Sequence, residues 1–313
     1  MPKINNQPNL YQHNVAGQMT LKAKILIFVL LILAFKLGYE AKSAKIFPIS
    51  EWTFKDSSRF NKPAGLYDGF GRLMSLPGKQ EAVCLNQDKN AAVLLAIGQS
   101  NSANSAEKKF TTKYPDKVLN YFDGKCYVAS SPLLGATGMK GEFITPIADK
   151  LIESGKYKSV LIISSGVENS PISRWQRDGD LNEMLLNVID KIGGKYKITG
   201  IIWHQGESDY INNTSAKVYA RSFNSLVETL KEKNVDSPIF ISIATKCRGG
   251  WAENSPTSVG QRQLIDNKRV FLGADTDKIL NDSDRSADRC HFSEAGQLKT
   301  AESFSTAIRE AQR

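Results

Sequence analysis

Ser100, Asp288 and His291 are the residues whose types and spacing could carry out a reaction. Ser100 stands in the motif Gly-Gln-Ser-Asn at 98–101, directly after an apolar run. Asp288 precedes His291 by three residues, so in a tight loop its carboxylate can accept the Nδ1 hydrogen of the imidazole. The other ring nitrogen is then free to take a proton from a serine hydroxyl. This spacing predicts a nucleophile, a base and a residue that orients the base. The alternative is an aspartate that caps the final helix beside a histidine that fills space.

Two further polar segments could support such a serine. The first is Trp-His-Gln-Gly-Glu-Ser-Asp at 203–209, where the Gln205 amide could donate a hydrogen bond to a developing oxyanion. The alternative for this segment is a hydrogen-bonded turn. The second is the glycine-rich loop 135–141, whose backbone N–H groups could approach a ligand closely. Gly138 and Gly141 are both candidates for a second donor. The loop matches neither common phosphate-binding pattern, which argues against a nucleotide site.

The segments between these motifs predict a sheet that would bring them together. Apolar runs alternate with helical patterns, which is typical of βαβ units and of a parallel sheet covered on both faces. Ligands bind such sheets at the carboxyl ends of the strands, where Ser100 and the 203–209 segment would lie. The predicted strands are 91–97, 126–130, 160–164, 198–203, 239–244 and 270–272, and the predicted helices are 181–192, 216–233, 258–267 and a last one from 294 onward.

Taken in order, the four motifs resemble the signature blocks of the SGNH hydrolase superfamily. More narrowly, they resemble its branch of sialate O-acetylesterases and acetylxylan esterases of carbohydrate esterase family 6. The blocks extend from Gly98 to Phe292. The resemblance implies an α/β fold, a three-layer α/β/α sandwich with a central parallel sheet of the flavodoxin-like SGNH kind. It also implies a serine esterase that removes O-acetyl groups from a glycan or sialic acid and uses no metal or cofactor.

The resemblance further implies roles for individual residues. Ser100, His291 and Asp288 would form the catalytic triad. The oxyanion hole would consist of the Ser100 backbone N–H, the Gly138 backbone N–H and the Gln205 side chain. The residues expected to line the substrate pocket are Gln99, Asn101, His204 and Glu207. Many members carry a large residue after the serine block, whereas this chain has Ser-Ala-Asn at 102–104.

Two other kinds of function are open alternatives at this point. One is a carbohydrate-binding protein of the cell surface that keeps the scaffold without catalysis, because a fold does not guarantee an activity. The other is an esterase for an acyl ester that is not a carbohydrate. A nucleic-acid-binding protein is not expected. The net charge is +9, the first 44 residues hold five lysines against one glutamate, and no dense basic stripe with interleaved aromatic residues follows.

The amino-terminal region predicts export. Residues 1–24 form a polar segment without acidic residues, and 25–39 hold an unbroken apolar run that fits a signal peptide or a short membrane anchor. A small-x-small cleavage pattern follows at 41–43. Residues 40–80 are predicted as a linker and irregular lead-in, and 81–313 as the esterase domain. We expect a periplasmic or extracellular enzyme, either secreted or held at the membrane by the apolar segment.

Four cysteines are consistent with export. An even count in an oxidising compartment suggests two disulfides, and four cysteines permit three pairings. We predict Cys84–Cys126 and Cys247–Cys290, because each pair would join neighbouring strand ends in the predicted order. No Cys-x-x-Cys spacing is present, so a zinc site is not expected.

Overall fold

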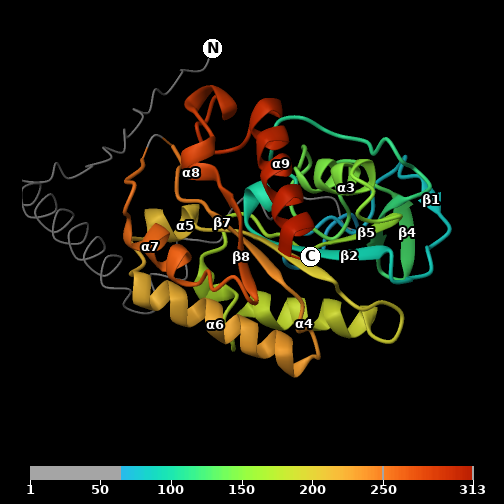
Figure 1. Ribbon diagram of the computed structural model, residues 1–313, viewed down its shortest axis with the longest axis horizontal. Helices are drawn as coiled ribbons and strands as arrows, with labels where there is room; N and C mark the ends of the chain where they lie inside the picture. Colours follow the sequence, from blue (N-terminus) through green and yellow to red (C-terminus); the bar gives the residue numbers. More distant parts are fainter. Residues whose placement is uncertain (1–64, 249, 312–313) are drawn as a thin grey trace, which may run out of the picture. The chain divides into compact units, whose positions relative to one another are not determined.

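The computed structural model describes residues 65–248 and 250–311 (Figure 1). The predicted polar segment 1–24, the signal or anchor 25–39 and the first part of the lead-in lie outside the described residues. Among the helices that are described, none has both the length and the apolar content needed to cross a membrane.

An eight-stranded sheet forms the middle layer, in the order β1-β4-β3-β5-β2-β6-β7-β8. The six strands from β3 to β8 in this order pair in parallel, while β4 and β1 add an antiparallel edge. The strands are β1 Glu81–Ala82, β2 Ala91–Gly98, β3 Val118–Phe122, β4 Lys125–Val128, β5 Ser159–Ser164, β6 Gly200–His204, β7 Ile239–Ile243 and β8 Val270–Asp275. The predicted sheet is confirmed, with a mixed edge where a wholly parallel one was expected.

The antiparallel edge begins with a tight hairpin between β3 and β4. Phe122 pairs with Lys125, and the two residues between them, Asp123 and Gly124, both have positive φ. An Asp-Gly pair suits this two-residue turn because its twist matches that of the flanking strands. Strand β3 is not among the predicted strands, because Asn120, which is buried in the structure, interrupts the apolar run of its five residues.

Helices cover both faces of the sheet, which confirms the three-layer arrangement (Figure 1). Alternate side chains of β2 point to opposite faces: Leu95 packs with α4 and α6, and Leu94 packs with α3 and α9. All eight residues of β2 are buried, so it is the central strand of the core. The helices are α3 Ile144–Glu153, α4 Asp180–Ile192, α5 Glu207–Ile211, α6 Ala216–Glu232, α7 Pro256–Gln263, α8 Thr276–Ile279 and α9 Glu294–Ala311.

The position of β2 makes the carboxyl ends of β2 and its neighbours the switch point of the sheet. Counted along the chain, the parallel strands have the order 2-3-1-4-5-6, so β2 lies between β5 and β6. This order differs from the 2-1-3-4-5 of flavodoxin in the placement of the first strand. The chain runs from β2 to one side and later returns to the other side at β6. Ligands of open α/β sheets bind where the connections part in this way.

Both predicted disulfides are present. Cys84–Cys126 joins the segment after β1 to β4, and Cys247–Cys290 joins the loop after β7 to the loop that carries His291. Part of the predicted lead-in also belongs to the folded domain. Leu73 is fully buried, and its backbone N–H donates to the Ala136 carbonyl at 2.8 Å.

Candidate active site

Ser100 is placed by the abrupt end of β2. Gly98 has φ 123°, and a Cβ there would lie 2.1 Å from the His204 carbonyl oxygen on neighbouring β6. Only glycine allows the two strands to come this close while the chain turns. Ser100 then opens the short 3₁₀ turn η2, Ser100–Ser102. Strand β2 therefore presents the serine at the carboxyl edge of the sheet, as the sequence predicts.

His291 is held by Asp288 in the predicted manner. The His291 Nδ1 atom lies 2.5 Å from Asp288 Oδ2, and the other carboxylate oxygen accepts the backbone N–H groups of Cys290 and His291 at 2.9 and 3.0 Å. Burial opposes the negative charge, but these hydrogen bonds outweigh it and hold the pKa of Asp288 well below its usual range. A carboxylate that stays ionised keeps Nδ1 protonated and leaves Nε2 as the basic nitrogen.

Ser100, Asp288 and His291 meet at one pocket of about 320 Å³. Within the described residues neither the Ser100 hydroxyl nor His291 Nε2 has a hydrogen-bond partner, and no hydrogen bond joins the two. Catalytic hydrogen bonds in enzymes without substrate are often long and tighten when substrate binds. The pocket is lined by Gln99, Ser100, Asn169, Pro171, Glu207, Ser208, Ile211, Asn212, Cys247, Arg248, Asp288, Cys290 and His291.

The structure distinguishes the two glycines that could supply a backbone donor. The Gly141 N–H donates to the Ala106 carbonyl at 2.8 Å, so it is engaged. Across residues 65–248 and 250–311, no acceptor is bonded to the N–H of Gly138 or of Ser100. Gly138 is not a wall of the pocket, but its loop is held beside the serine turn, because the Asn104 N–H donates to the Thr137 carbonyl at 2.8 Å.

The structure corrects the role predicted for Gln205. Its side chain is fully buried and does not line the pocket. Its amide nitrogen donates to Asp209 and, at 3.1 Å, to the Ser170 carbonyl, and its oxygen accepts the Tyr219 hydroxyl at 2.9 Å. Both amide hydrogens therefore have acceptors inside the protein. Burial raises the pKa of Asp209 despite these bonds. Gln205 stabilises the turn into α5, and its amide is not available to a substrate oxygen.

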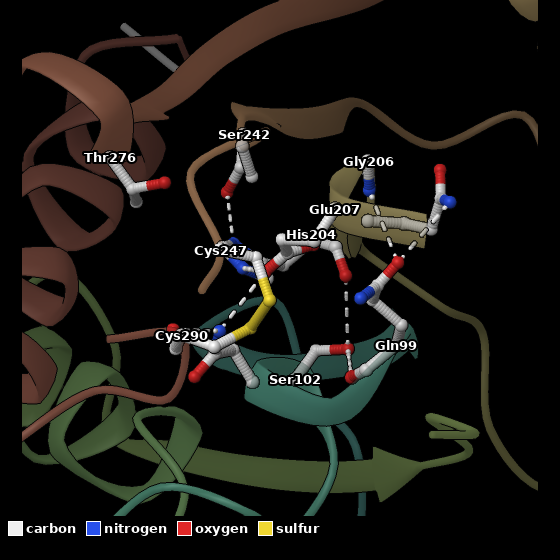
Figure 2. Close-up of polar contacts among 12 residues, drawn as sticks. Gln99, Ser102, His204, Gly206, Glu207, Ser242, Cys247, Thr276 and Cys290 are labelled. Atoms are coloured by element: carbon white, nitrogen blue, oxygen red, sulfur yellow. Dashed lines mark hydrogen bonds and ion pairs between the residues drawn. A yellow bond between two sulfur atoms is a disulfide. The ribbon is translucent and has the colours of Figure 1, made fainter. Parts of the chain in front are cut away.

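The Gln99 side chain turns its oxygen toward Gly206, at the start of α5 (Figure 2). Its side-chain oxygen accepts the backbone N–H groups of Ser208 and Gly206 at 3.2 and 3.4 Å. These groups belong to the first turn of α5, which has no internal partners for them. Because the oxygen caps the helix, the amide NH₂ group must point elsewhere. It has no hydrogen-bond partner among the described residues, and Gln99 is a wall of the pocket.

A buried polar chain lies behind the pocket. His204 Nδ1 is 2.7 Å from the Ser242 hydroxyl, and His204 Nε2 is 3.2 Å from Glu207 Oε1 (Figure 2). Burial would raise the pKa of Glu207, but the neighbouring His204 and the hydrogen bonds lower it below its usual value. Of the four residues expected at the pocket, Gln99 and Glu207 line it. His204 and Asn101 do not, because both are completely buried behind its walls.

The remaining walls come from loops that carry no motif. Asn169 and Pro171 follow β5, Asn212 follows α5, and Arg248 follows β7. Their only sequence signal is position, since each comes shortly after the carboxyl end of β5, β6 or β7. Among the described residues, no cluster of three or more histidine, cysteine or carboxylate side chains is arranged to hold a metal ion.

Comparison with known proteins identifies the family to which this chain belongs. Residues 90–310 match the family model described as "Carbohydrate esterase, sialic acid-specific acetylesterase". A probable carbohydrate esterase from Arabidopsis thaliana is 29% identical over 86 residues. This stretch covers 26% of the present chain and 32% of that relative, about a third of its length.

Two solved structures are similar in fold. The X-ray structure of a protein from Arabidopsis thaliana has a TM-score of 0.54 and 18% identity, over 70% of this chain and 96% of that one. The crystal structure of NanS has a TM-score of 0.50 and 18% identity, over 73% of this chain and 98% of that one. At this identity the two structures support the fold, and the match to the family model supports the kind of chemistry.

Proposed function

The chain belongs to the family of carbohydrate esterases described as sialic acid-specific acetylesterases, which are carboxylic ester hydrolases, and on that premise we propose that it removes O-acetyl groups from a carbohydrate through an acyl-enzyme on Ser100. One observation carries the proposal. Ser100 and the Asp288-bound His291 are far apart in the sequence, yet they line the same pocket.

The first half of the reaction forms the acyl-enzyme. Ser100 Oγ attacks the acetyl carbonyl carbon while His291 Nε2 takes the hydroxyl proton. The Asp288 carboxylate stabilises the imidazolium that forms. The tetrahedral intermediate then expels the sugar oxygen, which receives the proton from His291 and leaves as a free hydroxyl. Acetyl remains bound to Ser100.

Water completes the cycle by the same steps. His291 takes a proton from water, whose oxygen attacks the acetyl carbonyl, and the collapse of the second intermediate returns the proton to Ser100 Oγ. Acetate is released. In both halves the negative oxygen needs donors that are already in place. We assign this role to the unengaged N–H groups of Ser100 and Gly138 and to the amide of Gln99.

Two features support a carbohydrate ester as substrate. The family model describes carbohydrate esterases, and the similar Arabidopsis protein is named as a probable carbohydrate esterase. The pocket walls are mainly polar, with asparagine, glutamine, serine and arginine side chains that suit a hydroxylated ring. We also propose that the enzyme acts outside the cytoplasm. All four cysteines are paired, and disulfides persist in oxidising compartments.

The proposal is tested by acetate release from a panel of O-acetylated carbohydrates, including acetylated sialic acid and acetylated xylan. The variants are Ser100→Ala and a matched control, Ser303→Ala on α9, whose hydroxyl donates to the Gly273 carbonyl at 2.8 Å. We expect release by the wild type and the control, and none above background by Ser100→Ala. Release by Ser100→Ala at half the wild-type rate or more would overturn the assignment of the nucleophile. A wild-type protein that binds an acetylated glycan but releases no acetate would overturn the proposed esterase activity.

A further inference from the structure

Asn101 follows the proposed nucleophile and contacts the backbone on both sides of His291. Its side-chain oxygen accepts the N–H of Phe292 at 3.0 Å, and its amide nitrogen donates to the Cys290 carbonyl at 3.3 Å. The side chain is completely buried and is not a wall of the pocket. One amide therefore joins the turn of Ser100 to the loop of His291, 189 and 191 residues away along the chain.

The orientation of this amide is fixed by its partners. A backbone N–H can donate only to the oxygen, and a carbonyl can accept only from the nitrogen, so Phe292 and Cys290 permit one orientation. A third contact agrees with it, because the amide nitrogen also donates to Glu207 Oε1 at 3.0 Å. Glu207 in turn is fixed by its contact with His204. Both the donor and the acceptor side of Asn101 are therefore used.

Other contacts hold the His291 loop from different directions. Arg285 donates to the Cys290 carbonyl at 2.9 Å, and the Glu107 N–H donates to the Phe292 carbonyl at 2.9 Å. The disulfide holds Cys290 to the loop after β7. These contacts keep the loop folded, and among the hydrogen bonds of residues 65–248 and 250–311, those of Asn101 connect it to the turn of the nucleophile.

We propose that Asn101 is a positioning residue that sets the separation of Ser100 from His291 by binding the backbone on both sides of the histidine. This inference rests on the proposed function. Because Asn101 does not line the pocket, its loss is expected to lower kcat and to leave KM within about twofold. A misplacement of about 1 Å at a reacting group can cost about 10²-fold in rate, which sets the size of the expected fall.

The test uses Asn101→Ala and the nearly isosteric Asn101→Asp, with Asn120→Ala as the matched control. Asn120 on β3 is also completely buried, and it also binds backbone through both ends of its amide: the Leu134 N–H at 2.8 Å and the Leu134 carbonyl at 3.3 Å. It does not contact the His291 loop. Asn101→Asp keeps the acceptor for Phe292 but loses both donors and adds a carboxylate beside Glu207.

The measurements are kcat and KM for p-nitrophenyl acetate and the melting temperature of each variant. We expect both Asn101 variants to lose about 10²-fold in kcat at nearly constant KM. Asn120→Ala should lose a similar amount of stability and keep kcat within about threefold. A folded Asn101 variant with wild-type kcat, or an equal loss of kcat in Asn120→Ala, would overturn the inference. If Asn101→Ala does not fold, the kcat of Asn101→Asp decides whether the inference holds. Failure of the proposed function is recognised separately, because the wild type and Asn120→Ala would then also be inactive.

Discussion

The two disulfides allow a matched test of how the catalytic loop is held. Cys84–Cys126 and Cys247–Cys290 close loops with sequence separations of 42 and 43 residues. In the chain-entropy description, either crosslink stabilises the fold by about 4 kcal/mol at 25 °C, and the two values differ by less than about 0.1 kcal/mol. Their removal should therefore cost nearly the same stability. For a domain of this size the expected fall in melting temperature is roughly 8–16 °C in each case.

The effect on activity should differ sharply between the two. Cys290 precedes His291, and its backbone N–H donates to Asp288 at 2.9 Å, so its disulfide fixes the loop that carries the base. Cys84 and Cys126 are at the antiparallel edge, and neither lines the pocket. We expect Cys247→Ala/Cys290→Ala to lose at least about tenfold in kcat, because small misplacements of a reacting group are costly. Cys84→Ala/Cys126→Ala should keep kcat within about twofold.

The assay is p-nitrophenyl acetate hydrolysis at a temperature below both melting transitions, with thermal unfolding followed by circular dichroism. Equal loss of stability with unequal loss of kcat is the predicted result. If the two double variants lose kcat to the same extent, the disulfide acts only through global stability. This result would refute a role of the Cys247–Cys290 disulfide in holding His291 in place.

Three further predictions follow from the site. Asp288→Asn should lower kcat by about 10³–10⁴-fold at unchanged fold, because the base loses the group that fixes its tautomer; kcat within tenfold of wild type would contradict this. Because the folded pKa of Asp288 lies below its unfolded value, the charge stabilises the protein above the unfolded pKa, and this stability is lost as pH falls toward the folded value. The free energies of unfolding of wild type and Asp288→Asn in urea should therefore approach each other as pH falls below about 5; a difference that does not change with pH would contradict this. Gln99→Ala should lower kcat about 10²–10³-fold and Gln205→Ala should chiefly lower the melting temperature; the reverse pattern would restore Gln205 as the oxyanion donor.

The sequence was sufficient for the strands that carry the site, and the favoured one of the three possible cysteine pairings is the one that the structure contains. It was sufficient because β2, β5, β6 and β7 are apolar runs, and each ends in polar or small residues at the edge where a ligand binds. The spacing of Asp288 and His291 also predicted their hydrogen bond correctly, because three residues of tight loop leave few other arrangements.

The orientation of the two glutamines could not be read from the sequence. Gln205 lies in the more conspicuous motif, but the direction of its side chain depends on Asp209 of α5, Tyr219 of α6 and Ser170 in the loop after β5. Gln99 faces the pocket because α5 starts beside it and needs a cap for its first N–H groups. Likewise, Asn101 was expected in the pocket, and only the tertiary structure shows that it binds the His291 loop from behind. Such choices depend on hydrogen-bond partners that are distant in the chain.

The central claim is that Ser100 carries the acetyl group between the two halves of the reaction. The most direct test is to quench the reaction with p-nitrophenyl acetate during the first turnover, digest the protein and locate the added acetyl group by peptide mass spectrometry. The account predicts acetylation at Ser100, its accumulation in His291→Ala only at a greatly reduced rate, and its absence in Ser100→Ala. Acetyl transfer to another residue at the wild-type rate, or wild-type turnover during which the Ser100 peptide stays unmodified, would contradict it.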